Sequence, residues 1–313
     1  MAALLVVGIG LPPLGAVLRP YVTEAVFLLL VVSFARVDLV ALRGHLRRPG
    51  LVLAAIGWTT IAVPLLYGVG LALMGAPPGL ALGLMLHGIA SPMMAAPALA
   101  ALMGLDATLV LISLVGGTML VPLTAPLFAW IFLGDALPLS PLAMGLKLAA
   151  MLLGSLALAL AVRRWPGVPA LERHREAVNG FNILVLLVFV SAVMGDVAGQ
   201  TLADPLGVAW MALLALAIFL VLFGATALLF RRAGRQAALS LALMASQRNM
   251  GLMLAATDGA LPGAAWLYFA MCQFPIYLAP LLLRRLVRAG IRRDAPGSSA
   301  PAGSGSAKPP APP

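Results

Sequence analysis

Long apolar runs alternate with short polar segments along most of the chain. A membrane-spanning helix needs about 20 mostly apolar residues. Ten runs meet or approach that length, so the sequence predicts an all-α polytopic membrane protein with ten transmembrane helices. The predicted spans are 2–18, 22–41, 51–74, 78–103, 107–133, 141–163, 178–198, 205–230, 236–258 and 262–287. The first run is short and ends at Arg19-Pro20, so a cleaved signal peptide is the alternative for it.

Composition supports a membrane protein. Charged residues make up 10% of the 313-residue chain and hydrophobic residues 62%, whereas soluble domains carry about 25% charged residues. The single cysteine, Cys272, excludes an internal disulfide framework and a cysteine-rich metal site. The net charge of +10 comes from short basic clusters between apolar runs. Such clusters indicate orientation in a lipid bilayer, so we expect no nucleic-acid partner.

The basic clusters also predict which way the chain crosses the membrane. They follow the second, sixth, eighth and tenth runs, so ten spans place most of them on one side: Arg36, Arg43, Arg47, Arg48, Arg163, Arg164, Arg173, Arg175, Arg231, Arg232, Arg235, Arg284, Arg285, Arg288, Arg292, Arg293 and Lys308. The positive-inside rule then predicts a multi-pass protein of the cell (inner) membrane with both termini in the cytoplasm. The final segment, 291–313, is rich in Pro, Ala, Gly and Ser and is predicted to be a disordered cytoplasmic tail.

Residues 1–133 and 134–290 look like two copies of one five-helix unit. In each unit a basic connection follows the second helix, the fourth helix carries polar residues or prolines at mid-depth, and the fifth is rich in proline. Similar stretches, Leu-Thr-Ala-Pro-Leu at 123–127 and Tyr-Leu-Ala-Pro-Leu at 277–281, lie in the two fifth helices. An odd number of spans makes the second copy inverted. Inverted repeats with interrupted helices at matching positions are typical of secondary transporters.

The fourth predicted helix is interrupted by polar residues and prolines: His87, Ser91, Pro92 and Pro97. A proline removes a backbone donor and clashes with the carbonyl group four residues earlier. The two prolines predict a break between Ser91 and Ala96. Backbone groups freed there need partners from neighbouring helices, water or a ligand. A kinked helix satisfied by its neighbours is the alternative, because proline is frequent in transmembrane helices.

The ninth predicted helix is apolar except for a polar knot of four adjacent residues: Ser246, Gln247, Arg248 and Asn249. A charged side chain at mid-membrane costs about 2.5–3.5 kcal/mol on insertion scales, so it must face protein, water or a ligand. A structural ion pair is the alternative for Arg248. None of the ten acidic residues lies in the interior of the third, fourth, fifth, eighth, ninth or tenth span. The knot therefore favours a ligand site within the membrane.

Other polar residues within the spans are expected to be structural. Lys147 lies about two turns inside the sixth span, and we expect it to pair with Glu24 or Asp196 or to extend toward the interface. Three further side chains are expected to make helix–helix hydrogen bonds more often than ligand contacts: Thr118, Thr124 and Gln273.

In the order of these features, residues 1–290 resemble the bile acid:sodium symporter family. The resemblance is carried by stretches at the following positions: Leu18-Arg19-Pro20 through Asp38-Leu39, Arg43 to Arg48-Pro49, Pro77-Pro78 before the fourth helix, and the polar knot followed by Gly251-Leu252. It implies two inverted five-helix repeats. It also implies a panel domain of helices 1, 2, 6 and 7 that moves against a core domain of helices 3, 4, 5, 8, 9 and 10. In this family the unwound parts of helices 4 and 9 cross at mid-membrane.

The family's sodium-binding pattern is altered in this chain. Sodium-coupled members resemble one another in a Glu-x-Gly-Met-Gln-Asn stretch on helix 9, whose Glu and Gln bind sodium. Here Met244 stands at the Glu position and Arg248 at the Gln position, and only Asn249 matches. The Ser-Asn pair of helix 4 reads Ser91-Pro92, while Thr118 matches a ligand threonine on helix 5. These changes argue against sodium coupling, and we hypothesise that Arg248 occupies the sodium position as a fixed cation.

Together the features predict a secondary active transporter of a small organic anion that works by alternating access. Arg248 is expected to bind the anionic group, aided by half-helix dipoles. Hydrogen bonds are expected from five further residues: Asn249, Gln247, Ser246, Ser91 and Thr118. His87 is the candidate for proton coupling because imidazole titrates near physiological pH; a neutral histidine bonded inside the helix bundle is the alternative. The coupling ion is expected to be sodium or a proton, with no cofactor.

Two other functions remain open at this point. One is a proton-driven or facilitative efflux carrier on the same fold. The other is a membrane sensor that binds a ligand without transporting it, although the short final segment does not resemble a signalling domain. An intramembrane enzyme would need paired catalytic acids or a metal-binding motif. We find neither in the sequence, nor a phosphate-binding loop, and so expect no enzymatic activity.

Overall fold

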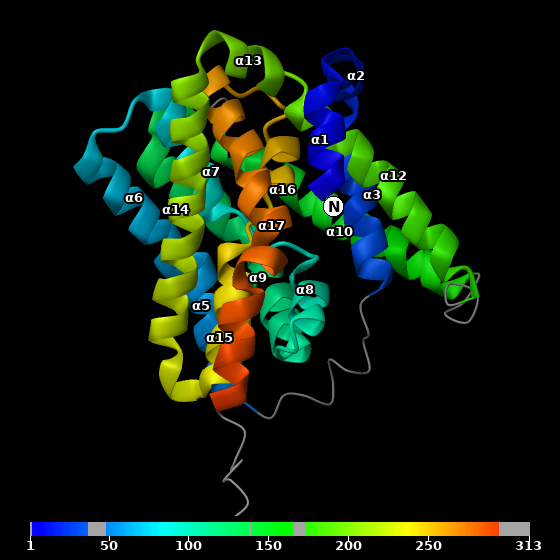
Figure 1. Ribbon diagram of the computed structural model, residues 1–313, viewed down its shortest axis with the longest axis vertical. Coiled ribbons are helices and arrows are strands. Elements are labelled where there is room, and N and C mark those ends of the chain that lie inside the picture. The colour runs from blue at the N-terminus through cyan, green and yellow to red at the C-terminus, as the bar shows by residue number, and fades with distance from the viewer. Residues whose placement is uncertain (1, 37–47, 138, 166–172, 294–313) are drawn as a thin grey trace, which may run out of the picture.

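The computed structural model describes residues 2–36, 48–137, 139–165 and 173–293, which form helices joined by short turns (Figure 1). The α-helices are α1 (Ala2–Gly10), α2 (Pro12–Leu18), α3 (Val22–Ala35), α5 (Pro49–Gly57), α6 (Val63–Met74), α7 (Pro78–Ile89), α8 (Ala96–Leu102), α9 (Ala107–Leu133), α10 (Pro141–Arg164), α12 (Arg175–Met194), α13 (Val197–Ala203), α14 (Pro205–Leu229), α15 (Arg235–Ser246), α16 (Met250–Ala256) and α17 (Gly263–Arg293). A π-helical turn, η2 (Trp58–Ala62), joins α5 to α6.

Six helical segments of the described chain are long and apolar enough to cross a membrane. They are Pro12–Ala35, Pro49–Met74, Ala107–Leu133, Pro141–Arg164, Arg175–Ala203 and Pro205–Leu229. The last five correspond to predicted spans three and five to eight. The fourth and ninth predicted spans are each divided into two shorter helices, α7 with α8 and α15 with α16. The apolar helices support a membrane-embedded protein.

The prediction of one continuous helix over residues 2–18 is wrong. Leu11 separates α1 from α2 with a non-helical backbone (φ -125°, ψ 66°), and Pro12 and Pro13 follow it. A proline disfavours the helical conformation of the residue before it. At the same time it suits the first turn of a new helix, where an N–H is not needed. The first apolar run therefore forms two short helices.

The tenth predicted helix extends further than expected. α17 continues to Arg293, past the predicted end at residue 287. The predicted disordered tail thus begins as helix over 291–293, and its remainder, 294–313, lies outside the described residues. The predicted basic connection at Arg43 and Arg47 also lies outside them.

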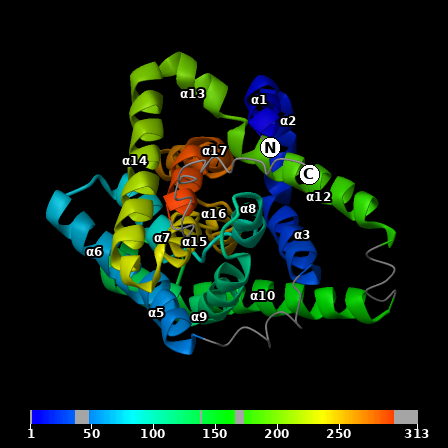
Figure 2. The same cartoon turned by 60° about the horizontal axis from the view of Figure 1, so that its bottom comes forward.

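The helices pack as two groups. α1, α2, α3, α10 and α12 contact one another and form the first bundle, while α5 to α9 and α14 to α17 form the second bundle. In Figures 1 and 2, α3 and α12 lie on the opposite flank of the molecule from α6 and α14. The bundles meet where α10 packs against α9 and where α3 packs against α16.

Buried apolar side chains form two clusters that differ in how they join the bundles. The larger cluster contains residues of both bundles, including Val26 of α3, Phe189 of α12 and Leu252 of α16. The smaller cluster joins α5, α8, α9, α14, α15 and α17 near the basic end of the molecule, where α5 and α15 begin beside Arg48 and Arg235. Within the described ranges, no side chain of the first bundle belongs to this smaller cluster.

The opposite end of the molecule carries ion pairs, and one of them corrects a prediction. Lys147 pairs with Asp258, which follows α16, rather than with Glu24 or Asp196. Asp196 instead pairs with Arg19 at 2.8 Å. The partner of Lys147 was unpredictable because it depends on α16 packing beside α10.

Candidate ligand-binding site at the crossing of two interrupted helices

The predicted break in the fourth span lies between α7 and α8. Ala90, the residue after α7, has an extended backbone (φ -61°, ψ 147°). Pro92 has no N–H to donate to the carbonyl of Gly88, its helical partner four residues earlier. The helix therefore ends before Pro92. Pro97 lies in the first turn of α8, where the missing N–H costs little.

The predicted break in the ninth span lies between α15 and α16 and contains no proline. Gln247 leaves the helical conformation (φ -94°, ψ 94°). The Asn249 side chain then caps α16, because its Oδ1 accepts the N–H of Leu252 at 3.2 Å. Asparagine is a preferred N-cap residue. Polar side chains thus end one helix and start the next without a proline.

The two breaks contact each other as a short antiparallel bridge between Pro92 and Arg248. The N–H of Met93 donates to the carbonyl of Gln247 at 2.6 Å, and the N–H of Asn249 donates to the carbonyl of Ser91 at 2.7 Å. In apolar surroundings every backbone polar group needs such a partner. The crossing therefore stabilises both breaks and fixes their side chains relative to one another.

The Arg248 guanidinium binds backbone carbonyls. The side chain is buried, and its Nη1 donates to Ala90 O at 3.0 Å and to Thr59 O at 3.3 Å. Its Nη2 donates to Gly88 O at 3.0 Å and to Thr59 O at 3.3 Å. Nε has no hydrogen-bond partner in the described part of the chain, and no salt bridge of Arg248 is found there. The structural ion pair considered from the sequence is therefore replaced by a set of carbonyl oxygens.

Prolines explain why two of these carbonyls have no backbone N–H partner and can accept from Arg248. The carbonyl of Gly88 lacks its usual helical donor because residue 92 is proline. In η2 the backbone hydrogen bonds span five residues instead of four. In that register the carbonyl of Thr59 would be paired with residue 64, which is also a proline, Pro64. The planar guanidinium, with its five N–H donors, replaces the hydrogen bonds that both prolines remove.

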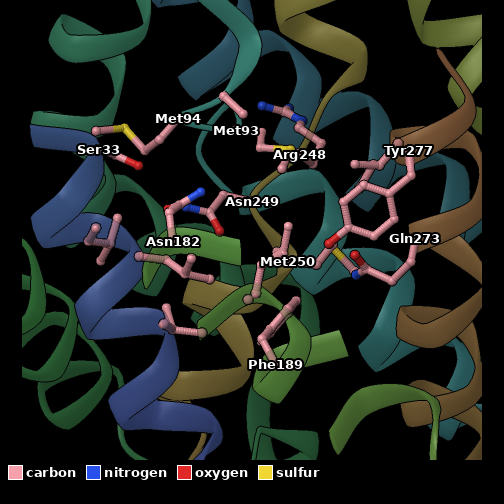
Figure 3. A pocket seen from close by; sticks show the side chains of 17 residues that line it. Ser33, Met93, Met94, Asn182, Phe189, Arg248, Asn249, Met250, Gln273 and Tyr277 are labelled. Atoms are coloured by element: carbon pink, nitrogen blue, oxygen red, sulfur yellow. The ribbon is translucent and has the colours of Figure 1, made fainter. Parts of the chain in front are cut away.

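A cavity of about 110 Å³ lies between this crossing and the first bundle (Figure 3). α3 and α12 line one side, while α17 and the two breaks line the other. Its polar lining residues are Ser33, Asn182, Arg248, Asn249, Gln273 and Tyr277. In the view of Figure 3, the side-chain amides of Asn182 and Asn249 extend into the same part of the cavity. Residues from both bundles therefore surround one site.

The cavity offers hydrogen-bond donors and positive charge. Capping of α16 occupies Asn249 Oδ1 and so leaves the two N–H groups of Nδ2 available. The Arg248 charge has no acidic neighbour among the lining residues that the structure describes. Amide N–H groups donate well to carboxylate, sulfonate or phosphate oxygens, and a nearby positive charge favours the anionic form. The cavity is chemically suited to a small anion.

Of the predicted site residues, Arg248 and Asn249 line the cavity. The other five lie outside its lining: Ser91, Ser246, Gln247, Thr118 and His87. Ser246 donates to the Leu243 carbonyl of its own helix at 3.1 Å. Three of the side chains are buried without a hydrogen-bond partner in the described part of the chain: Ser91, Thr118 and Gln247.

His87 lies between two tyrosines in the second bundle. Its Nδ1 is 2.9 Å from the Tyr67 hydroxyl and 3.0 Å from the Tyr268 hydroxyl. Both tyrosine rings meet the imidazole edge to face, with ring centres 5.7 Å apart. This arrangement is the one expected of a histidine bonded inside the helix bundle.

Sequence reasoning missed three polar lining residues: Ser33, Asn182 and Tyr277. Asn182 carried a usable signal, because it is a polar residue inside an apolar run. Ser33 and Tyr277 carried little signal, since serine and tyrosine occur often in transmembrane helices. Only the approach of α3 and α17 to the crossing gives these two residues a place at the cavity.

The expected helix–helix hydrogen bonds of Gln273 and Thr124 are corrected by the structure. Each side chain instead donates within its own helix, Gln273 to Phe269 O at 3.5 Å and Thr124 to Leu120 O at 3.2 Å. Gln273 also lines the cavity.

The fold and this site together define the broad class of the protein. The chain is a helical membrane protein whose broken helices meet beside a cavity. No model of a known protein family matches the chain, and no curated protein matches it either. Over the residues that the structure describes, no three His, Cys, Asp or Glu side chains lie together as a metal site would require.

Proposed function

We propose that the protein is a secondary transporter of a small organic anion that works by alternating access. The observation that carries this proposal is the crossing of two interrupted helices, one of which contributes a buried cation, beside a cavity lined by both bundles. Discontinuous helices at a central site are the usual construction of secondary transporters. A transporter needs its site between parts that can move against each other.

The proposal includes the finer architecture predicted from the sequence. Ten spans in two inverted repeats, 1–133 and 134–290, would resemble the bile acid:sodium symporter family. The first bundle would then be the moving panel and the second bundle the core. This assignment is supported by the packing of α1, α2, α3, α10 and α12 as one group. Most of the basic residues would lie on the cytoplasmic side of the cell membrane, and both chain termini would lie on the same side.

In this proposal Arg248 acts as a fixed cation in place of a bound ion. Three backbone carbonyls, those of Thr59, Gly88 and Ala90, surround its guanidinium, as carbonyl oxygens surround a metal cation. One of them, the carbonyl of Gly88, lies in the last turn of α7, where the helix dipole favours positive charge. Transport would therefore not require sodium.

The anion would be bound mainly by hydrogen bonds from Asn249 and by the charge of Arg248. The terminal nitrogens of Arg248 already bind carbonyls, so its contribution to the ligand is electrostatic. Asn249 Nδ2 supplies two directed donors. The amide of Asn182 and the hydroxyl groups of Ser33 and Tyr277 would contact the remainder of the substrate.

Uptake into proteoliposomes tests the proposal. Purified protein would be supplied with labelled short-chain carboxylates and organosulfonates under imposed sodium, proton or no gradient. We expect saturable uptake of at least one anion, at a rate that changes less than about twofold when choline replaces sodium. Strict dependence on sodium would reject the fixed cation. Uptake of none of the anions would reject the substrate class.

The Asn249→Asp variant tests the contribution of Asn249 to ligand binding without changing its role in the fold. Aspartate caps a helix as well as asparagine, so α16 should remain intact. The change removes both N–H donors and turns a negative charge toward the anion. We expect uptake to fall by at least about tenfold with an unchanged melting temperature. Asn249→Ser, which keeps a cap and one hydroxyl donor, is the matched control and should retain intermediate uptake.

The Arg248→Ala variant tests whether Arg248 acts as the fixed cation of the site. The empty carbonyl cage should abolish uptake, and millimolar guanidinium ion in the buffer should restore part of it. Unchanged uptake by Arg248→Ala would remove this residue from the site.

A further inference from the structure

Polar contacts between the two bundles gather at the end of the molecule opposite the basic end, which is marked by Arg48 and Arg235. Trp266 of α17 donates its indole N–H to the carbonyl of Val193 in α12 at 3.3 Å. The Arg19 guanidinium lies 4.0 Å from the centre of the Trp266 ring. Lys147 of α10 pairs with Asp258 after α16. Each contact joins the first bundle, or the turn between its helices α2 and α3 in the case of Arg19, to the second bundle or the turn after α16.

Apolar packing shows the same difference between the two ends. The larger apolar cluster includes Trp266 and joins both bundles, whereas the smaller cluster at the basic end has no member from the first bundle within the described ranges. The cavity lies against α3 from Val26 to Ser33, toward the basic end of that helix. The bundles are therefore held together at one end and separated by a cavity nearer the other.

We propose that Lys147, Asp258, Arg19 and Trp266 form a latch that must open before the cavity becomes accessible from the end of the molecule opposite Arg48 and Arg235. The inference rests on the proposed alternating-access function. It gives that function a specific gate, made of side chains that take no part in lining the cavity.

The turn after α16 is built to hold Asp258 at this position. Asp258 has a positive φ of 51°, and Gly259 follows with a φ of 67°. The N–H of Gly259 donates to the carbonyl of Leu254 at 2.9 Å, which closes the end of the helix. Glycine is usually preferred in such a conformation, although aspartate tolerates it better than most residues. An aspartate here is explained by its contact with Lys147.

The latch is suited to reversible opening because its ion pair is partly exposed. The side chains of Lys147 and Asp258 are 40% and 66% exposed, and exposed ion pairs contribute little. Losing one such pair shifts the equilibrium between the closed and the open latch by about twofold to fivefold. The buried Trp266 hydrogen bond is the stronger contact and should resist opening more.

A labelling experiment with the full chain in vesicles tests the latch. Cys272 is the single cysteine, so Cys272→Ser provides a background without thiols. Val26→Cys reports the part of the cavity nearest the latch, and Ser33→Cys reports the part nearest the basic end. A membrane-impermeant maleimide is then applied from each side separately.

Lys147→Met and Asp258→Asn are each expected to raise labelling of the Val26→Cys reporter from the latch side by about twofold to fivefold. Labelling of the Ser33→Cys reporter from the basic side should fall. The double variant should exceed neither single variant, because both remove the same contact. Trp266→Phe, which keeps an aromatic ring but removes the indole N–H, should give a larger increase.

Asp204→Asn is the matched control. It removes an acid in the loop before α14, and asparagine keeps the cap on Gly207, so labelling should not change. Unchanged labelling in Lys147→Met and Asp258→Asn, or additive effects in the double variant, would overturn the latch. If Val26→Cys does not fold, Leu30→Cys replaces it one turn further along α3.

Labelling needs no substrate, so the two proposals fail separately. Increased labelling without anion uptake by the wild-type protein would support the latch and reject the proposed substrate class. Normal uptake with unchanged labelling would reject only the latch.

Discussion

The two interrupted helices meet at one point but are broken by opposite means. Between α7 and α8, Pro92 removes a donor and leaves the carbonyl of Gly88 without its helical partner. Between α15 and α16 there is no proline, and the polar residues there bring additional donors. One break is therefore rich in acceptors and the other in donors. In a membrane, where water does not satisfy backbone groups, each break stabilises the other.

The comparison explains how a buried arginine is tolerated here. Desolvation of its charge is costly. The carbonyl of Gly88 lies in the last turn of α7, at the negative end of its dipole. Ala90 contributes a second carbonyl just after that helix, and Thr59 contributes a third from η2. A lysine could not span all three carbonyls with a planar set of donors. The donor-rich break thus depends on arginine, and the acceptor-rich break depends on proline.

The largest expected effect comes from removing the donors. Arg248→Met leaves the carbonyls of Thr59, Gly88 and Ala90 without partners, and each buried unpaired carbonyl costs about 1–3 kcal/mol. We expect a loss of stability of about 3 kcal/mol or more, measured as a lower melting temperature in detergent by tryptophan fluorescence.

Arg248→Lys is the control for this change. It keeps the charge and should retain part of the stability. A methionine variant as stable as the wild type would mean that the guanidinium does not hold the two breaks together.

The next prediction concerns the acceptor-rich break, where the carbonyl of Gly88 lacks a helical donor. Pro92→Ala gives residue 92 an N–H, which allows α7 to extend and satisfy the carbonyl of Gly88. In the Arg248→Met background we expect this second change to recover about 1 kcal/mol. Pro97→Ala is the matched control, because Pro97 sits in the first turn of α8 where no donor is missed. Equal recovery by both prolines would argue against a specific shortage of donors at Gly88.

The positions of the breaks could be predicted from the sequence because their causes are local. Pro92 and the polar knot around Arg248 lie within a few residues of the ends of α7 and α15. The break at Leu11 had an equally local cause in Pro12 and Pro13. The length of the apolar run nevertheless favoured one continuous helix in the prediction.

The partners of the side chains could not be predicted, because they depend on contacts across the chain. The carbonyl of Thr59 is free only if η2 is π-helical, and nothing in the apolar run reveals that register. Asp258 meets Lys147 across 111 positions of sequence. The cavity likewise exists only where α3, α12 and α17 approach the crossing. The pattern of residues predicted a site at Arg248, but not which of its atoms would be available to a ligand.

A third prediction tests how tightly the end of α7 is packed. A Cβ atom on Gly88 would lie 2.6 Å from Cγ of Tyr67, whose hydroxyl also bonds His87. The ring cannot move without breaking that bond. Gly88→Ala should therefore destabilise the protein by about 1–3 kcal/mol, measured by thermal unfolding. A Tyr67→Ala background, which removes the ring, should reduce this effect.

The corresponding glycine of the other break should tolerate the same change. A Cβ atom on Gly251 would lie 3.1 Å from the edge of the Phe189 ring and 3.2 Å from Val26 Cγ2, so small shifts of these side chains suffice. Alanine also favours the helical conformation of α16 by about 0.5–1 kcal/mol. We expect Gly251→Ala to change stability by less than about 1 kcal/mol in the same assay.

A loss as large as that of Gly88→Ala would show that the donor-rich break is packed as rigidly as the acceptor-rich one. A small loss would place the rigid part of the crossing at α7. The contact with the first bundle, to which Phe189 and Val26 belong, would then be the part free to move.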